Sequence, residues 1–197
     1  MDVITHYDLL IEEGNDPFRD CPKLRDYMDG WDGDSFIEAL ELDTDKTALE
    51  IGIGTGRLAA RVAPHCNKLV GIDVSSKTIE RAKDNLNKFS NISLICADFE
   101  SYEFAEKYDV IYSSLTFMHF ENKKAVIEKI FSILKSRGIF CLSIDKSQND
   151  YIDFKTRKLR IFPDNPENII KIISDLGMTV TSIQETVHAF IITSRKQ

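Results

Sequence analysis

The stretch Glu50-Ile51-Gly52-Ile53-Gly54-Thr55-Gly56-Arg57 stands at the junction of two different sequence patterns. The run TALEIG (47–52) predicts a β-strand, and GRLAARVAP (56–64) predicts a helix that ends at Pro64. Glycines at such a junction let the backbone turn sharply and approach a ligand without a Cβ clash. The unpaired N–H groups at the start of the following helix add partial positive charge. The junction therefore fits a bound nucleoside with a charged tail.

Beyond this junction, short β-rich runs alternate with amphipathic segments along the rest of the chain. Further strands are expected at 68–73, 92–97, 108–114, 138–145, 178–185 and 186–194, and further helices at 75–89, 122–136 and 166–177. Such alternation is typical of a parallel sheet with helices on both faces, and the tight link between the last two strands predicts an antiparallel pair. We therefore expect an α/β fold of three αβα layers, in which a doubly wound, mostly parallel sheet of seven strands carries an antiparallel C-terminal edge pair.

Residues 1–46 differ from the rest, because they mix Asp, Pro and Gly with aromatic side chains. This segment is too aromatic for a linker and too punctuated for one long helix, so we expect an ordered helical appendage that acts as a lid, with a short helix at 36–42 packed on the sheet. The core domain is expected at 47–197, and the chain as a single compact domain overall. Seven aromatic residues are expected to form either an apolar lid or a local mini-core: Tyr7, Phe18, Tyr27, Trp31, Tyr151, Phe154 and Phe162.

The overall charge and the apolar runs exclude several classes of partner. The chain of 197 residues has 25 Lys and Arg against 32 Asp and Glu, a formal net charge of −7, which argues against nucleic acid as a partner. No apolar run approaches the roughly 20 residues that span a bilayer, so no membrane partner is expected. The first residues lack the pattern of a secretory signal, so we expect a cytoplasmic location.

The four cysteines, Cys21, Cys66, Cys96 and Cys141, are far apart, and no histidine lies near them at a zinc-ligand spacing. No metal site is expected. Cys96 and Cys141 lie inside apolar runs, where a thiol packs like a small hydrophobic side chain. The sequence therefore predicts free, buried thiols.

Two acidic residues follow later strands of the expected sheet. Asp73 ends the second strand, at the spacing where a carboxylate accepts hydrogen bonds from both hydroxyls of a ribose, although it equally fits a helix cap. Asp98 follows the third strand, where an isolated loop aspartate commonly forms an Asx-turn. The dinucleotide fingerprint G-x-G-x-x-G would require a glycine where this chain has Arg57. An NAD-linked oxidoreductase is therefore an alternative that the loop disfavours.

The segment 50–56 resembles motif I, E/D-x-G-x-G-x-G, of the class I S-adenosylmethionine-dependent methyltransferases. The segments 97–99, 108–120 and 134–145 resemble later motifs of that family, so the likeness covers residues 47–145. It implies a Rossmann-like fold, S-adenosylmethionine as cofactor and S-adenosylhomocysteine as product. The cofactor-binding residues that it implies are Glu50, Gly52, Gly54, Gly56, Asp73, Val74, Asp98, Phe99 and Ser114.

The resemblance also implies individual roles. Glu50 would lie near the methionine end of the cofactor, or else hold backbone donors of the glycine loop. Asp98 would accept from the adenine amino group, and Phe99 would pack near the adenine ring. Ser114 would reach the carboxyl edge of the sheet.

Methyl transfer from a sulfonium mainly requires alignment of the reactants and exclusion of water, so no catalytic residue is mandatory. His119 follows the fourth strand, where it is either a general base for a hydroxyl or amine acceptor or a packing residue. With or without a base, the resemblance implies a methyltransferase that acts on an O, N or C nucleophile. A non-catalytic relative that binds adenosyl cofactors stays a further alternative.

The acceptor is expected to be a small molecule, because no extended basic surface or nucleic-acid recognition domain is apparent. The compact basic cluster consists of Lys155, Arg157, Lys158 and Arg160. This cluster either receives an anionic group of the acceptor or forms a solvated basic strand. A monomer or a homodimer is expected.

Overall fold

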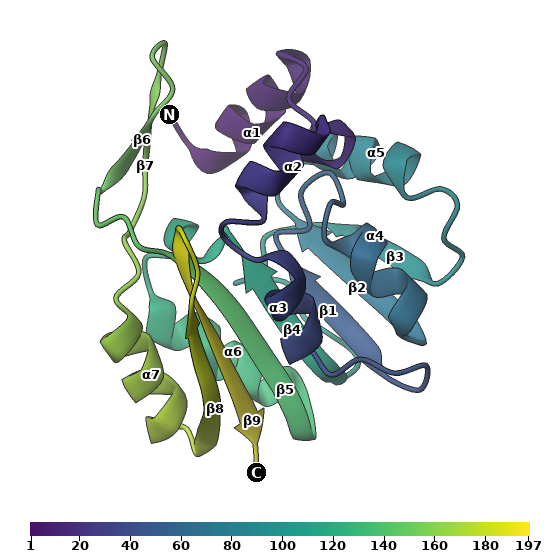
Figure 1. Ribbon diagram of the computed structural model, residues 1–197, viewed down its shortest axis with the longest axis vertical. Helices are drawn as coiled ribbons and strands as arrows, with labels where there is room; N and C mark the ends of the chain where they lie inside the picture. The colour runs from purple at the N-terminus through teal and green to yellow at the C-terminus, as the bar shows by residue number, and fades with distance from the viewer.

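The core of the computed structural model, which describes residues 1–197, is a sheet of seven strands in the order β3-β2-β1-β4-β5-β9-β8 (Figure 1). The strands are β1 (Thr47–Ile51), β2 (Lys68–Asp73), β3 (Ile92–Cys96), β4 (Tyr108–Ser114), β5 (Leu134–Asp145), β8 (Met178–Glu185) and β9 (Ala189–Lys196). The first five pair in parallel, whereas β9 pairs antiparallel with both β5 and β8. The predicted mostly parallel sheet with an antiparallel edge pair is therefore confirmed.

Helices cover both faces of this sheet and complete three layers. One face carries α3 (Gly33–Ala39), α4 (Ala59–Val62) and α5 (Ser76–Asn85), the other carries α6 (Lys123–Ile133) and α7 (Pro166–Asp175), and single 3-10 turns occur at η1 (Pro17–Arg19), η2 (Ala63–His65) and η3 (Phe117–His119). The apolar positions of α6 recur at three and four residue steps, as at Val126, Ile130 and Ile133, and face the sheet. Each such buried side chain contributes about 1.5–3 kcal/mol.

The helix expected at 36–42 forms as α3, and Phe36 and Leu40 are fully buried against the sheet. Two further helices of the N-terminal segment, α1 (Val3–Glu12) and α2 (Pro22–Met28), lie over the carboxyl ends of the parallel strands, at the top of Figure 1. The Asp8 carboxylate accepts a hydrogen bond from the Ser75 hydroxyl (2.6 Å), and Glu12 pairs with Lys77. These contacts hold α1 against the beginning of α5, directly above the sheet edge.

A short hairpin of β6 (Tyr151–Asp153) and β7 (Lys158–Arg160) also rises above this edge (Figure 1), and the sequence analysis did not predict it. Arg157, in the turn of the hairpin, pairs with both carboxylate oxygens of Glu13 (2.5 and 2.6 Å) and donates to His6 Nδ1 (3.1 Å). The hairpin is therefore attached to the end of α1.

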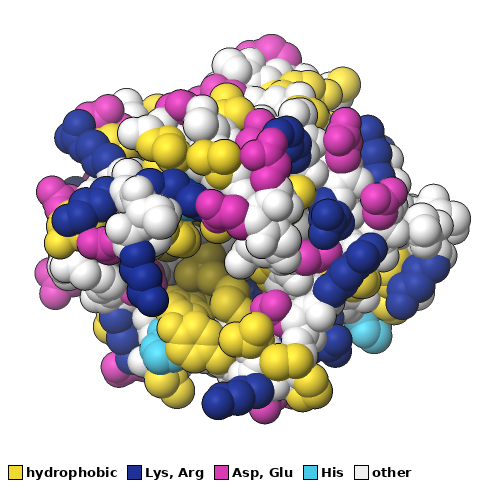
Figure 2. All heavy atoms as spheres, turned by 90° about the horizontal axis from the view of Figure 1, so that it is seen from above, with side chains coloured by type: hydrophobic (Ala, Val, Ile, Leu, Met, Phe, Trp, Pro, Cys, Tyr) yellow, Lys and Arg dark blue, Asp and Glu magenta, His cyan; other side chains and the backbone are white.

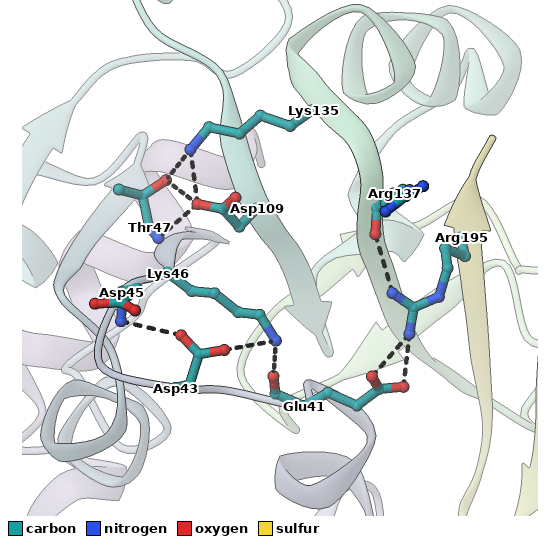
Figure 3. A network of polar contacts seen from close by, with 9 residues as sticks. All are labelled: Glu41, Asp43, Asp45, Lys46, Thr47, Asp109, Lys135, Arg137 and Arg195. Carbon is teal, nitrogen blue, oxygen red and sulfur yellow. Dashed lines mark hydrogen bonds and ion pairs between the residues drawn. The ribbon is translucent and has the colours of Figure 1, made fainter.

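A network of polar contacts ties the strands together at the opposite edge, where the parallel strands begin (Figure 3). The Asp109 carboxylate accepts from the Thr47 backbone N–H (2.8 Å) and lies 2.7 Å from Lys135 Nζ, which joins β1, β4 and β5. Arg195 on β9 pairs with both carboxylate oxygens of Glu41 at 2.8 Å. These ion pairs link β4 to β5 and β9 to the loop after α3, and ligands of open α/β folds bind at the other, carboxyl edge.

Several element boundaries differ from the expectation, and two helices show the physical reason. The helix expected to run through Ser136 ends at Ile133, because Leu134 already pairs with Tyr108 in the sheet. The helix expected at 56–64 is one turn of α-helix followed by the 3-10 turn at Ala63–His65, which contains Pro64. Strand pairing of Leu134 therefore ends the first helix, and the missing N–H of Pro64 ends the second.

The prediction of buried thiols is correct for Cys66 and Cys141 but wrong for Cys21 and Cys96, whose residues are exposed. Cys96 ends β3, which is the edge strand of the sheet, so its apolar neighbours in sequence do not cover it. All four thiols are free. None of the helices has both the length and the apolar character needed to cross a bilayer.

Candidate active site

A cavity of about 1000 Å³ lies at the carboxyl ends of β1, β2, β4 and β5, beneath α1, α2 and the β6–β7 hairpin. Figure 2 shows this face from above, hollowed near its middle, with hydrophobic side chains on the floor and walls of the hollow. The cavity brings together all but one of the predicted site residues: Glu50, Gly52, Gly54, Asp73, Val74, Asp98, Phe99, Ser114 and His119. Gly56 is the exception. A Cβ on Gly56 would lie 2.7 Å from a methyl of Leu86, so this glycine allows the loop to pack on α5.

The glycine loop follows β1 directly, and all three of its glycines have positive φ. Gly52 has φ +75°, and a Cβ there would lie 2.0 Å from Thr116 Oγ1. Gly54 has φ +56°, and a Cβ there would meet no atom within 4 Å. The first glycine lets β1 and the loop after β4 approach each other, and the second leaves the loop bare on its open side.

Asp73 lies at the end of β2 and fixes the shape of the loop. Its two carboxylate oxygens accept from the backbone N–H groups of Gly54 and Ser75, each at 3.0 Å. Burial raises the pKa of Asp73, although these two hydrogen bonds act in the opposite direction. No cation pairs with it. Since each carboxylate oxygen has two acceptor sites, the Asp73 carboxylate keeps acceptor capacity for further donors in the cavity.

Glu50 is buried under the loop, with a residue exposure of 3%. The Tyr112 hydroxyl donates to Glu50 Oε2 at 2.9 Å, and no backbone N–H of the glycine loop donates to Glu50. Burial raises the pKa of Glu50 to about 8, although the Tyr112 hydroxyl and the charge of Arg57 act in the opposite direction. Glu50 is therefore a largely protonated acid at neutral pH.

Asp98 and Phe99 follow β3. The exposed Asp98 carboxylate accepts from the backbone N–H groups of Glu100 and Ser101, each at 3.2 Å, which is an Asx-turn. Phe99 is 3% exposed and packs against the rings of Phe104 and Phe120. Both residues line the cavity, so the turn and a role toward a ligand are compatible.

The sequence analysis missed Asp32, which connects the N-terminal segment to the glycine loop. Its buried carboxylate contacts Arg57 Nη1 and Nη2 at 3.0 and 2.5 Å and accepts from the Ser114 hydroxyl at 2.8 Å. Arg57 therefore has a structural reason to stand where a dinucleotide site has glycine. Nothing local in the sequence marks Asp32 among the acids of residues 1–46.

His119 lies on η3 and contacts a residue of α1. The Tyr7 hydroxyl and His119 Nε2 are 2.8 Å apart, and His119 Nδ1 is buried without a hydrogen-bond partner. Burial, together with the nearby charges of His6 and Lys123, lowers the pKa of His119 to about 4. The ring is therefore neutral at neutral pH. Tyr7 was expected only as part of an apolar lid or of a local mini-core, because its partner is 112 positions away.

The expected aromatic lid is only partly assembled at the cavity. Five of the seven aromatic residues line it, namely Tyr7, Tyr27, Trp31, Tyr151 and Phe154, whereas Phe18 and Phe162 do not.

None of the basic cluster lines the cavity. Arg157 is held by Glu13, Lys158 lies 3.6 Å from Asp153, and Arg160 lies over the ring of Phe162. On β7, Lys158 and Arg160 share the exposed face and the buried Leu159 points to the other face, because residues two apart on a strand point the same way.

Comparison with known proteins agrees with this arrangement. A family model described as a methyltransferase domain matches residues 42–172 of the chain. Malonyl-acyl-carrier-protein O-methyltransferase 2 of Ilyobacter polytropus is 32% identical over 119 residues, which cover 59% of this chain and 45% of that protein. The chain therefore spans less than half the length of this curated relative.

Solved structures show the same fold over nearly the whole chain. The N-methyltransferase NodS from Bradyrhizobium japonicum, in complex with S-adenosyl-L-homocysteine, superposes with a TM-score of 0.70 at 22% identity, over 96% of this chain and 97% of that one. The (4+2)-cyclase SpnF superposes with a TM-score of 0.75 at 18% identity, over 98% and 95% of the two chains. At these identities the likeness shows the fold.

Proposed function

This chain belongs to the methyltransferase family whose domain its residues 42–172 match, as the resemblance to the class I S-adenosylmethionine-dependent enzymes predicted, and from that membership we propose that it transfers a methyl group from S-adenosylmethionine to a small-molecule acceptor. The observation that carries the proposal is the convergence of a bare glycine loop, the Asp73 carboxylate and the Asp98 turn on one cavity. Because ligands of open α/β folds bind at this edge of the sheet, the cavity is the expected site for both reactants.

The residues present fit the cofactor. The Asp73 carboxylate keeps two acceptor sites after bonding Gly54 and Ser75, which matches the two hydroxyls of a ribose. The open side of Gly54 leaves room for a ligand against the loop. Asp98 and Phe99 would hold the adenine, and Glu50 would lie near the methionine end, while Gly52, Val74 and Ser114 line the same cavity.

The bound cofactor would supply a methyl group on a sulfonium that is already activated as a leaving group. The chain then has to orient the acceptor and exclude water, which the lid of α1, α2 and the hairpin supports. We propose His119 as the proton acceptor. Its ring is neutral at neutral pH and therefore has a nitrogen lone pair that can accept a proton, although a pKa lowered to about 4 makes it a weak base; Nε2 is the nitrogen that faces the Tyr7 hydroxyl.

Calorimetric titration of the purified protein with S-adenosylmethionine, S-adenosylhomocysteine and NAD tests the proposal. We expect micromolar dissociation constants for both adenosyl compounds, equivalent to about −8 kcal/mol, and no binding of NAD. A radiolabelled methyl group then reports transfer to candidate acceptors. Binding of NAD would favour the oxidoreductase alternative. Binding of the adenosyl compounds without transfer to any acceptor would favour a non-catalytic relative.

Three expectations from the sequence stay predictions. They are the division of the chain at residues 46 and 47, a monomer or homodimer as the oligomeric state, and the cytoplasmic location. Size-exclusion chromatography with light scattering measures the oligomeric state.

A further inference from the structure

The wall of the cavity is predominantly acidic. Nine of the lining residues are Asp or Glu, of which Glu50 is largely protonated at neutral pH, and Arg57 is the one lysine or arginine among the lining residues. The Arg57 guanidinium is already bonded to Asp32 and lies 3.5 Å from Asp29, so it offers little free positive charge. A negatively charged acceptor would enter a field of like charge, which opposes its binding.

The half of the cavity beyond the expected cofactor site lies at the end of β5 and has a carboxylate of its own. Asp145 ends β5, and its two oxygens accept from Trp31 Nε1 (2.9 Å) and the Ser147 backbone N–H (2.6 Å). No lysine or arginine pairs with Asp145, whereas Lys123 pairs with Asp164 and Lys158 with Asp153. Asp145 is therefore a carboxylate in this half that is free to pair with a cation of the acceptor.

The indole of Trp31 meets this carboxylate through its N–H edge, so the aromatic ring lies directly beside the charge. Trp31 is fixed from two sides, by the Tyr27 ring at 5.1 Å and the His188 ring at 4.3 Å between centroids. A carboxylate beside an aromatic ring is a favourable setting for an ammonium group, because ion pairing and the cation–π attraction act together.

The mouth of the cavity is apolar. The structure exposes seven large hydrophobic side chains to solvent, and four of them line this cavity: Ile4, Leu24, Tyr27 and Tyr151, between 43% and 55% exposed. They come from α1, α2 and β6, so three separate segments place apolar surface at one opening. Exposed apolar side chains gathered in this way mark a surface that a ligand covers.

From these observations, and resting on the proposed function, we infer that the methyl acceptor is an amine that carries an apolar group. The ammonium form pairs with Asp145 beside Trp31, and the apolar group lies along the mouth. After loss of a proton to water or to His119, the nitrogen lone pair forms a bond to the methyl carbon. The carbon–sulfur bond breaks with its electron pair going to sulfur, so the sulfonium becomes a neutral thioether and the nitrogen carries the methyl group.

Binding to the complex with S-adenosylhomocysteine tests this inference with probes matched in length. Hexylamine, hexanol and hexanoate have similar chain lengths and positive, neutral and negative head groups, and ethylamine lacks the longer apolar chain. We expect hexylamine to bind at least about tenfold more tightly than hexanoate, hexanol or ethylamine, and to accept a radiolabelled methyl group. Equal or tighter binding of hexanoate would overturn the charge argument. Equal binding of ethylamine would overturn the role of the apolar mouth.

A variant pair separates the local carboxylate from the overall charge of the protein. D145N keeps an acceptor for Trp31 Nε1 but removes the charge, and D45N removes the same charge from an exposed residue at the opposite edge of the sheet. We expect D145N to weaken hexylamine at least about fivefold and to leave hexanol unchanged, with D45N like the parent for both. Equal hexylamine affinity of D145N and the parent would overturn the inference. If the parent protein does not bind S-adenosylhomocysteine, that result would instead refute the proposed function.

Discussion

Replacing Asp32 by asparagine removes the negative half of the buried ion pair that joins the N-terminal segment to the glycine loop. The Asp32 side chain is 0% exposed and the Arg57 side chain 15% exposed. Besides Arg57, the Asp32 carboxylate accepts from the Gly33 backbone N–H (2.7 Å) and the Ser114 hydroxyl (2.8 Å). D32N therefore leaves a poorly solvated guanidinium facing an amide instead of a carboxylate.

Breaking one partner of a buried ion pair costs about 3–5 kcal/mol. Asp29 stays 3.5 Å from Arg57 and is 45% exposed, so it recovers about 1 kcal/mol at most. We therefore expect D32N to lower the free energy of unfolding by about 3 kcal/mol. At about 2–4 °C per kcal/mol for a chain of this size, the melting temperature falls by about 9 °C.

Urea unfolding measures this loss, and Trp31, the single tryptophan of the chain, is a fluorescent reporter next to the substituted residue. R57M and D32N/R57M complete a double-mutant cycle. The double variant contains no unpaired buried charge, so its loss should be smaller than the sum of the single losses by about 2 kcal/mol. A loss below about 1 kcal/mol for D32N, or additive losses in the cycle, would refute the reasoning.

Three further predictions concern the loop and its acids. D73N should weaken S-adenosylmethionine binding by about 1–3 kcal/mol in calorimetry, because hydrogen bonds to a charged acceptor are lost, and unchanged affinity would contradict the site assignment. Because burial raises the pKa of Glu50 to about 8 from 4.5, the folded chain holds a proton that the unfolded chain releases, so the free energy of unfolding falls as the pH rises through this window. E50Q should flatten that fall in urea titrations at several pH values, and an equally steep fall would show that Glu50 is not its source. G52A should lower stability by about 1–3 kcal/mol, since its Cβ would strike Thr116 at φ +75°, whereas G14A, with a similar φ but no atom within 4 Å, should cost less. Equal losses of stability for G52A and G14A in thermal unfolding would contradict the argument that the Gly52 Cβ strikes Thr116.

The element order was predictable because its signals are local. Ser75 caps α5, Asn122 caps α6, and Gly177 at φ +83° follows α7, and each of these signals lies within a few residues of the helix end that it marks. The hairpin of β6 and β7 was missed because its strands have three residues each, too short for an alternating pattern to show.

The position of the candidate site followed from the same local signals. The glycine loop, Asp73 and Asp98 each come directly after a strand, and parallel strands bring their carboxyl ends to one edge. The long-range contacts of the side chains around this site could not be predicted from local signals. Tyr7 meets His119 from 112 positions away, Trp31 meets Asp145 from 114 positions away, and both contacts depend on how the N-terminal helices cross the sheet edge.

The sequence by itself therefore determined the fold class, the place of the ligand loop and the family, because periodicity, caps and glycine spacing act over a few residues. The tertiary structure alone decided which groups face the cavity. In the folded chain the basic cluster lies outside the cavity, Arg57 pairs with Asp32, and Asp145 lies beside Trp31 without a cation. The physical reason is that the charge of a cavity depends on side chains brought together from distant segments, and no pattern within one segment specifies that meeting.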